Sequence, residues 1–238
     1  MPLPIREFLI DKIVSESSEV KSFYLSPLDG KPIHFLPGQF VMISLELPNG
    51  RNQRNAYSIS SSPLQTSTIR ITLSLHGEFT QALFQKKPGD KLKIDGPWGK
   101  FVLDESSPLD AVFIAGGVGI TPLISMIKYL HETKSQRRIF LFYSSHSPSH
   151  LIFLSELSSM AQQNQNFKTI YCITGKGEAP ENIKCYRRRI DAEMLSLELG
   201  QVQQKQYYIC GPPPMVEGIV NLLEQMGVAY ENIKNERW

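Results

Sequence analysis

The segment 113–122, Phe-Ile-Ala-Gly-Gly-Val-Gly-Ile-Thr-Pro, constrains the fold of this chain more than any other. The apolar run leading into it predicts a buried strand, its glycines predict a tight turn, and the apolar residues after it recur with helical period as far as Leu130. We expect Thr121 to cap this helix and Pro122 to occupy its first position. A strand, a glycine turn and a helix start together present backbone N–H groups and a positive helix end to a phosphate.

The same segment partly matches the dinucleotide-binding pattern G-x-G-x-x-G. Gly117 and Gly119 stand at the first two glycine positions, but Pro122 stands at the third. The segment is therefore a variant of that pattern. A strand-to-helix turn without a ligand remains the alternative for the segment taken alone.

The first hundred residues have the short alternating runs and the turn residues that are typical of antiparallel strands. We predict strands at Ile5–Val14, Val20–Leu25, Phe40–Leu47, Ala56–Ile59, Ile69–Leu75 and Lys91–Ile94, and one short helix at about Thr80 to Gln85. Six strands of this kind with one helix predict a six-stranded antiparallel β-barrel.

Strands alternate with helices after residues 106–108. The predicted strands are Ala111–Ala115, Arg138–Tyr143, Phe167–Thr174, Tyr207–Cys210 and one within Glu231–Trp238, and the predicted helices are Pro122–His131, Leu151–Ala161, Asp191–Leu199 and Pro214–Met226. Such alternation predicts a five-stranded parallel sheet with helices on both faces. We therefore expect an α+β protein of two domains, residues 1–105 and 106–238.

Composition limits the classes of function that are open to the chain. Its 238 residues are 41% hydrophobic and carry a net charge of +2, which is too small to indicate a nucleic-acid or membrane surface. The three cysteines predict neither a disulfide framework nor an iron–sulfur cluster held by four cysteines of this chain. Because we find no signal-peptide core and no long apolar run, we expect a cytoplasmic protein.

Two strand ends carry glycines and prolines, at Gly116–Pro122 and at Cys210–Met215. In an open parallel sheet, ligands bind beyond the carboxyl ends of the strands. We expect these two ends to be neighbours and to form one ligand site, which is a more specific signal than either segment alone.

The barrel half contains two further candidate ligand segments. In the first, the ring of Tyr57 is suited to stacking on a planar ring system and the guanidinium of Arg54 to pairing with a phosphate. Packing of Tyr57 into the barrel core is the alternative. In the second, Gly77 allows close approach of the backbone to a ligand and Thr80 is expected to cap the short helix. An ordinary hairpin connection is the alternative there.

Together these segments resemble the ferredoxin–NADP reductase superfamily, the flavoprotein reductases that join a flavin-binding barrel to a pyridine-nucleotide-binding domain. The resemblance extends over the whole chain and is carried, in order, by Tyr57-Ser58, Gly77-x-x-Thr80, Gly96-Pro-x-Gly-x-Phe101, Gly116-Gly-x-Gly-x-Thr-Pro122, Cys210-Gly-Pro-Pro-Pro-Met215 and Glu236-x-Trp238. It implies an FAD-binding β-barrel domain over residues 1–105 and a Rossmann-like NAD(P)-binding α/β domain over residues 106–238.

The resemblance also implies a role for each matching residue of the barrel. Tyr57 would stack on the flavin ring, and Ser58 would lie beside its reactive nitrogen. The flavin pyrophosphate would be held at the helix start by Gly77, Glu78, Phe79 and Thr80, which favours FAD over FMN. The remaining implied flavin contacts are Arg54, Ala56, Ile59, Leu73 and Leu75.

In the second half, the resemblance implies that the pyrophosphate site of NAD(P)H is shaped by Gly116, Gly117, Val118, Gly119, Thr121 and Pro122. The nicotinamide would be lined by Cys210, Gly211, Pro212 and Met215, and Glu236 and Trp238 would cover the opposite side of the flavin. The implied catalytic residues are Ser58, Cys210 and Glu236.

One position departs from the family pattern. The family's arginine stands two residues before the tyrosine, where this chain has Asn55, and Arg54 lies one place earlier. Adjacent residues of a strand point to opposite faces. Either a bulge turns Arg54 toward the flavin phosphate, or another basic residue takes that task.

The sequence favours no metal site and no covalent catalysis. Pro148 separates His146 from His150 and argues against a helical pair of metal ligands. No base is evident beside Cys210, so we assign it a positioning role.

The choice between NADH and NADPH depends on the residues that meet the ribose. The strand ending at His146 offers neither an acid for NADH nor an arginine for NADPH. Lys176 or Arg187–Arg189 are candidates for a 2′-phosphate, which slightly favours NADPH, and surface charge is the alternative.

The resemblance implies an FAD-dependent oxidoreductase that takes a hydride from NAD(P)H and passes electrons to a separate ferredoxin, flavodoxin or oxygenase component. Three alternatives stay open: an NAD(P)H reductase of free flavin, a non-catalytic electron-relay subunit, and a nucleotide-binding module without chemistry. Ser58, Cys210 and Glu236 argue against the last, because a binding module has no need of all three.

Overall fold

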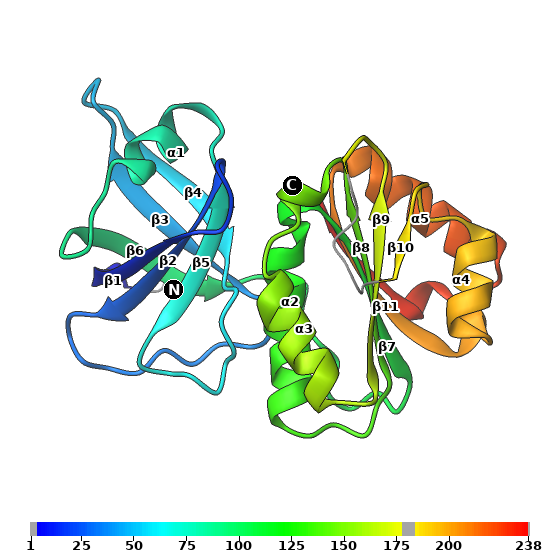
Figure 1. Cartoon of the computed structure of the whole chain (residues 1–238). Helices are drawn as coiled ribbons and strands as arrows, with labels where there is room; N and C mark the ends of the chain where they lie inside the picture. The colour runs from blue at the N-terminus through cyan, green and yellow to red at the C-terminus, as the bar shows by residue number, and fades with distance from the viewer. Residues whose placement is uncertain (1–3, 178–183, 238) are drawn as a thin grey trace. The chain divides into compact units, whose positions relative to one another are not determined.

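The structure is a computed structural model that describes residues 4–177 and 184–237. It divides into two compact units (Figure 1). The first runs to Leu103 and includes Ile124–Tyr129; the second comprises Asp104–Leu123 and the residues from Leu130 onward.

The first unit is a barrel of six antiparallel strands in the order β4-β3-β6-β1-β2-β5, as predicted. Its elements are β1 (Arg6–Ser15), β2 (Val20–Pro27), β3 (Phe40–Glu46), β4 (Asn52–Ser58), β5 (Ile69–Ser74), α1 (Gly77–Phe84) and β6 (Lys91–Trp98). An antiparallel bridge from Ile59 to Ile71 connects the end of β4 to β5 and closes the sheet.

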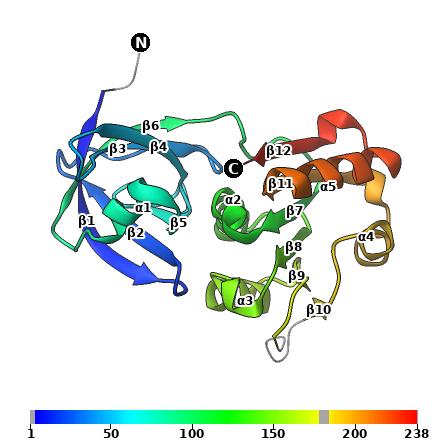
Figure 2. The same ribbon diagram turned by 90° about the horizontal axis from the view of Figure 1, so that it is seen from above.

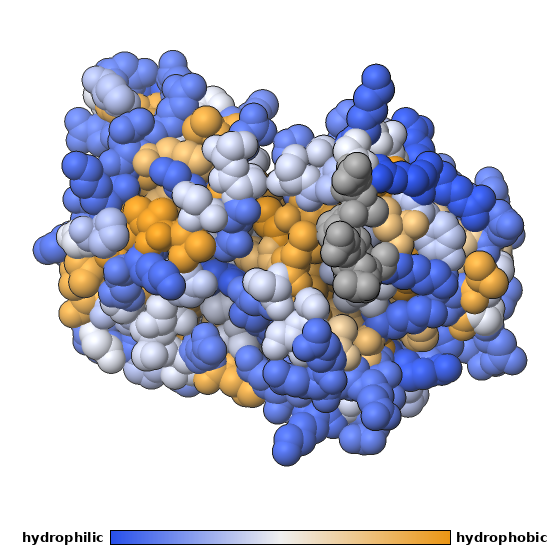
Figure 3. Space-filling view, in the orientation of Figure 1, coloured by the Kyte–Doolittle hydropathy of each residue, from blue (hydrophilic) through white to orange (hydrophobic). Residues whose placement is uncertain are grey.

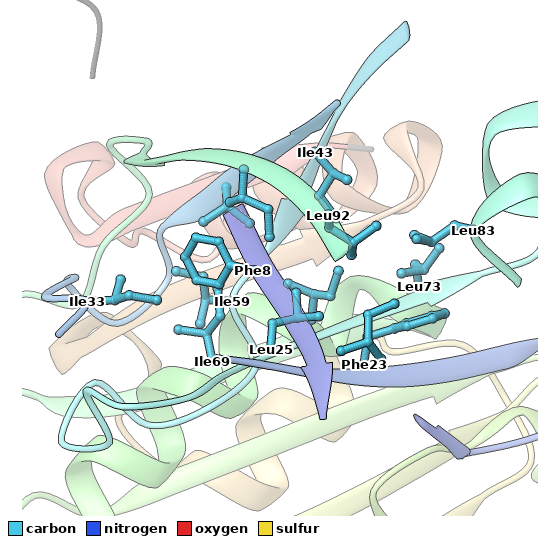
Figure 4. Close-up of a cluster of buried hydrophobic side chains, with 14 of the residues drawn as sticks. Phe8, Phe23, Leu25, Ile33, Ile43, Ile59, Ile69, Leu73, Leu83 and Leu92 are labelled. Atoms are coloured by element: carbon cyan, nitrogen blue, oxygen red, sulfur yellow. The ribbon is translucent and has the colours of Figure 1, made fainter. Parts of the chain in front are cut away.

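Alternation of buried residues along the strands builds the barrel core. Figure 4 shows Phe8 of β1, Phe23 and Leu25 of β2, and Leu83 of α1 among the side chains that gather there. Each such side chain contributes roughly 1.5–3 kcal/mol by leaving water. The face of this unit visible in Figure 3 is a mixture of hydrophilic and hydrophobic residues.

Helix α1 begins earlier than predicted. Gly77, at φ +76°, turns the chain directly from β5 into the helix, so Thr80 lies in the first turn and is not the cap. The Thr80 hydroxyl accepts a hydrogen bond from the backbone N–H of His76 (2.6 Å) and donates one to the carbonyl of Gly77 (3.2 Å). Thr80 therefore stabilises the loop that leads into the helix.

The second unit is an α/β domain with a parallel sheet in the order β10-β9-β8-β7-β11-β12. Its strands are β7 (Asp110–Gly116), β8 (Ile139–Ser145), β9 (Phe167–Ile173), β10 (Cys185–Tyr186), β11 (Lys205–Gly211) and β12 (Ile233–Arg237). The fold class is as predicted, but the sheet has six strands and not five. The additional strand, β10, has only two residues, which is too short to produce a periodic pattern.

Helices cover both faces of this sheet. They are α2 (Ile120–Glu132), α3 (Leu154–Gln163), α4 (Ala192–Leu199) and α5 (Pro213–Gln225), with single 3₁₀ turns η1 (Gly117–Gly119), η2 (Pro148–His150), η3 (Val202–Gln204) and η4 (Tyr230–Asn232). Figures 1 and 2 show α4 and α5 on one face, with α3 and the start of α2 on the other. In the part of the chain that the structure describes, no helix has the length and apolarity needed to cross a membrane.

The strand faces explain this arrangement. Val112 and Ile114 of β7 belong to the same buried cluster as Leu195 of α4 and Ile219 of α5. The residues between them on β7, such as Phe113, point to the other face, and Phe113 stacks on Tyr208 of β11 at 5.2 Å between ring centroids. Burial on both faces accounts for the continuous apolar runs of these strands.

Candidate cofactor sites

The carboxyl ends of β7 and β11 are neighbours, as the sequence predicts. Ala115 pairs with Cys210 in the parallel register of these strands. A helical segment starts directly after each strand, and neither Gly116 nor Pro212, the residues that precede the two helical segments, caps it with a side chain. Two helix starts therefore meet at one edge of the sheet. Of the two, the start of η1 offers backbone N–H groups that no cap side chain occupies. The start of α5 does not, because Pro212, Pro213 and Pro214 have no N–H and the N–H groups of Met215 and Val216 donate to the carbonyl of Pro212.

The two glycine-rich segments interlock. A Cβ atom at Gly119 would lie 2.3 Å from the carbonyl oxygen of Cys210 and 2.8 Å from the Cα of Gly211. A Cβ atom at Gly116 would lie 2.6 Å from the sulfur of Met215. At Gly119 the obstacle is backbone, which cannot move aside, so glycine is required there and the contact fixes the distance between the two strand ends. At Gly116 the obstacles are the side chains of Met215 and Pro212.

Thr121 and Pro122 do not have the predicted capping positions. The η1 turn leads straight into α2, which begins at Ile120. The buried Thr121 hydroxyl donates to the carbonyl of Val118 at 2.9 Å, so its bond stabilises the glycine turn, as that of Thr80 does at α1. Pro122 still lies in the first turn of α2, where its missing N–H has no intrahelical partner to lose.

Cys210 lies beside Glu236, its register partner across the parallel pair of β11 and β12. Burial raises the pKa of the Cys210 thiol above its ordinary value, and the Glu236 charge adds to the shift. Burial also raises the pKa of the Glu236 carboxyl. The thiol is therefore protonated at neutral pH, which makes it a poor nucleophile. Trp238 lies outside the described residues.

In the barrel, Tyr57 packs partly into the core, and its role in stacking on a flavin stays a prediction. Its ring stacks on Phe79 of α1 at 5.9 Å between centroids and packs against the barrel core. The side chain is nevertheless only half-buried, so part of it is accessible to a ligand. Burial raises the pKa of Tyr57, so the phenol stays neutral. Ser58 is the next residue and pairs with Phe40 of β3.

The other predicted flavin contacts fall into two groups. Ile59, Leu73 and Phe79 lie in the barrel core, where only their backbone atoms are left for a cofactor. Ala56, Leu75, Gly77 and Glu78 are exposed, and a Cβ at Gly77 would meet no atom within 4 Å. The start of α1 is thus open to a ligand.

Arg54 points away from Tyr57. Strands β3 and β4 pair in unbroken register from Phe40–Ser58 to Glu46–Asn52, so the bulge considered above is absent. The Arg54 guanidinium lies 2.5 Å from a carboxylate oxygen of Asp95, which also accepts a hydrogen bond from the Trp98 indole at 2.8 Å. The alternative in which a bulge turns Arg54 toward the flavin phosphate is therefore wrong.

The face that carries Tyr57 holds a chain of polar contacts that the sequence analysis missed. Asn55 donates to the Tyr57 hydroxyl at 3.5 Å, Gln53 donates to Asn55 at 3.0 Å, and Arg51 donates to Gln53 at 3.2 Å. The signal was available, because residues 51, 53, 55 and 57 follow one another with the period of a strand.

A second feature lies at the carboxyl ends of β8 and β9. The backbone N–H of Gly175 donates to the carbonyl of His146 at 2.8 Å, and a Cβ at Gly175 would lie 2.5 Å from that oxygen. This contact brings exposed Lys176 next to His146. Arg187 and Arg189 are exposed just after β10, whereas Arg188 is paired with Asp191 and Glu193.

Two parts of the chain match known domain families. Residues 7–103 match the oxidoreductase FAD-binding domain, and residues 113–221 match the oxidoreductase NAD-binding domain. The chain belongs to the ferredoxin–NADP reductase superfamily. Its two domains are those that bind FAD and NAD(P)H.

Curated relatives in this superfamily include flavohemoproteins and oxygenase reductases. Flavohemoprotein A of Dictyostelium discoideum is 30% identical over 247 residues, which is 97% of this chain and 59% of that protein. The reductase component of propane 2-monooxygenase from Mycolicibacterium smegmatis is 24% identical, over 94% of this chain and 65% of that protein. The chain therefore spans about three fifths of the length of these reductase-superfamily proteins.

A solved structure has the same fold. The flavohem-like FAD/NAD-binding domain of nitric oxide dioxygenase from Vibrio cholerae superposes with a TM-score of 0.88 and covers 98% of both chains at 23% sequence identity. The likeness extends over both superfamily domains.

The described residues fit both cofactors of the superfamily. The open start of α1 and the half-exposed Tyr57 provide an anion site and a stacking surface for FAD. The uncapped start of η1, after β7, leaves backbone N–H groups for the phosphates of NAD(P)H. Among residues 4–177 and 184–237, no three His, Cys, Asp or Glu side chains gather as a set of metal ligands.

Proposed function

We propose that this protein is an NAD(P)H-dependent reductase that passes electrons by way of FAD to a separate one-electron acceptor. The observation that carries the proposal is the pairing of buried Cys210 with half-buried Glu236 at the strand edge where two helix starts meet. A module that only binds nucleotides needs the helix starts, but it has no use for a half-buried acid of raised pKa beside them. FAD, when bound, supplies the chemistry that accepts a hydride and releases electrons singly.

The residues have distinct tasks in this proposal. The first turn of α1, from Gly77 to Thr80, holds the flavin pyrophosphate, and Tyr57 with Ser58 positions the flavin ring. Gly116–Pro122 receives the pyrophosphate of NAD(P)H. Cys210 excludes water and positions the nicotinamide, and the raised pKa of the Glu236 carboxyl suits this residue to move a proton.

An oxygenase component is the acceptor class that we favour. The propane 2-monooxygenase relative is named as a reductase component, and this chain matches 94% of its own length to it. Ferredoxin and flavodoxin are the other candidates from the sequence. The three cysteines are free thiols, which suits the reducing cytoplasm where we place the protein. We also place the domain boundary between residues 105 and 106.

An absorbance spectrum of the purified protein tests the proposal, followed by anaerobic addition of NADPH and then of NADH. We expect a flavin spectrum that bleaches with a reduced nucleotide. Colourless protein that FAD does not reconstitute would overturn the proposal of bound flavin. Turnover with added free flavin would then identify a free-flavin reductase, and its absence would identify a binding module.

A further inference from the structure

Arg51 faces the start of α1, whereas Arg54 does not. The Arg51 guanidinium lies 3.4 Å from the carboxylate of Glu78, a residue in the first turn of α1. It also donates to Gln53 at 3.2 Å, which places it on the face that carries Tyr57. Arg51 therefore bridges the two parts of the barrel that we assign to the flavin.

The partners of the two arginines differ in a way that matters for a ligand. Arg54 contacts Asp95, whose side chain is only 3% exposed. If Arg54 left Asp95 to bind a phosphate, the buried carboxylate would lose its ion-pair partner. The side chains of Arg51 and Glu78 are 63% and 65% exposed. An exposed pair of this kind contributes little to stability, typically about 0–1 kcal/mol, so Arg51 exchanges its partner easily.

We propose that Arg51 is the base that pairs with the pyrophosphate of bound FAD, taking the phosphate in place of the Glu78 carboxylate. The inference rests on the proposed function, because it requires FAD at the start of α1. A guanidinium pairs with phosphate through charge-assisted hydrogen bonds, which are stronger than neutral ones. The contacts through Gln53 and Asn55 to Tyr57 set the direction in which Arg51 extends along the strand.

The Glu78 carboxylate, unlike the Arg51 guanidinium, is expected to weaken FAD binding. Its carboxylate competes for Arg51 and repels a phosphate at the helix start, while its backbone N–H remains available there. Removing the Glu78 charge should therefore leave FAD affinity unchanged or increase it severalfold. This behaviour would be unusual for a residue in a binding site.

Titration of the flavin-free protein with FAD and with riboflavin, followed by flavin fluorescence, tests the proposal without measuring activity. We expect Arg51→Gln to weaken FAD binding about 10-fold to 100-fold and to leave riboflavin binding unchanged, since riboflavin has no phosphate. The FAD loss should shrink at high salt, because the pair is exposed. Lys91→Gln, which removes an exposed cation elsewhere on the barrel, is the matched control for net charge.

Three results would overturn the inference. The first is an Arg51→Gln protein that binds FAD as tightly as the wild type. The second is an Arg54→Gln protein that loses FAD affinity while Arg51→Gln does not. The third is an equal loss for riboflavin and FAD, which would indicate damage to the barrel, and the thermal midpoint of the apoprotein would reveal that damage independently. If wild-type protein binds no FAD, the proposed function fails as well, whereas the other results leave it intact.

Discussion

Glu236 lies beside Cys210 across the parallel pair of β11 and β12, and burial raises the pKa of both groups. The two residues are 26 positions apart in the sequence, and the sheet register alone makes them neighbours. A protonated thiol next to an acid of raised pKa is suited to holding a neutral ring and keeping a proton nearby. It is unsuited to thiolate chemistry.

Glu236→Gln should flatten the pH dependence of flavin reduction by NAD(P)H. A carboxyl with a raised pKa keeps its proton at pH values above the ordinary 4.5 and loses it as pH rises further. We therefore expect a wild-type rate that changes with pH above 4.5 and a variant rate that does not, with a loss of about 100-fold for a group that moves a proton. Stopped-flow reduction across this range is the measurement. An identical profile for both proteins would remove Glu236 from the reaction.

The three thiols should differ in reactivity. Cys172 and Cys210 are buried, and burial raises the pKa of Cys172 to about 12, whereas Cys185 is half-exposed. Native protein treated with iodoacetamide should be modified first at Cys185, and the other two should react only after unfolding. Mass spectrometry of the native and the denatured samples gives the order. Rapid labelling of Cys210 in the native protein would contradict the assigned positioning role.

Gly119→Ala should destabilise the second unit and weaken nucleotide binding. The added Cβ would press on the carbonyl of Cys210 at 2.3 Å, and backbone atoms cannot move aside as a flexible side chain does. We expect a loss of about 1–3 kcal/mol in the free energy of unfolding. Gly218→Ala is the matched control, because a Cβ there meets no atom within 4 Å. That substitution should stabilise α5 by up to about 1 kcal/mol, and urea unfolding distinguishes the two variants.

The pH dependence of stability should have a component from Glu198. Burial would raise the pKa of Glu198, but hydrogen bonds from Lys168, Lys184 and Tyr186 outweigh it and lower the pKa to about 2. The folded protein binds this proton less tightly than the unfolded chain. The stabilisation is therefore complete above the ordinary value of 4.5 and is lost as pH falls toward about 2.

Glu198→Gln tests that component. At pH 7 we expect a loss of about 1–3 kcal/mol in the free energy of unfolding, and the difference from wild type should diminish between pH 4.5 and pH 2. Urea unfolding at several pH values measures it. The control is Glu193→Gln, whose carboxylate is 75% exposed and pairs with Arg188. A difference that persists unchanged in acid would show that the Glu198 charge is not its source.

Lys176→Gln should discriminate between the two coenzymes. We propose that Lys176, next to His146 at the carboxyl ends of β8 and β9, meets the 2′-phosphate of NADPH. The KM for NADPH should rise roughly 10-fold, as expected for the loss of one charged hydrogen bond, and the KM for NADH should not change. Equal effects on both coenzymes, or none, would leave Lys176 as a surface charge and remove the preference for NADPH.

Local patterns determined most of the elements. The period of the apolar residues placed five of the six barrel strands and all four helices of the second unit near their observed positions, because such periods follow from local backbone geometry. The exception is β4, which begins at Asn52 and not at Ala56, because its first four residues are polar and carry no apolar period. The helix starts were less accurate. At Thr80 and Thr121 the sequence predicts caps, but the helices begin earlier, at Gly77 and Ile120, and each hydroxyl donates to a carbonyl three residues before it.

The sequence by itself determined two domains, the glycine-rich strand ends and the superfamily, since these follow from residues near one another along the chain. Only the tertiary structure decided that Arg54 meets Asp95, that Arg51 faces α1, and that Glu236 lies beside Cys210. The reason is physical. Which side chains meet depends on strand register and on the face that each residue takes, and a shift of one position reverses every face.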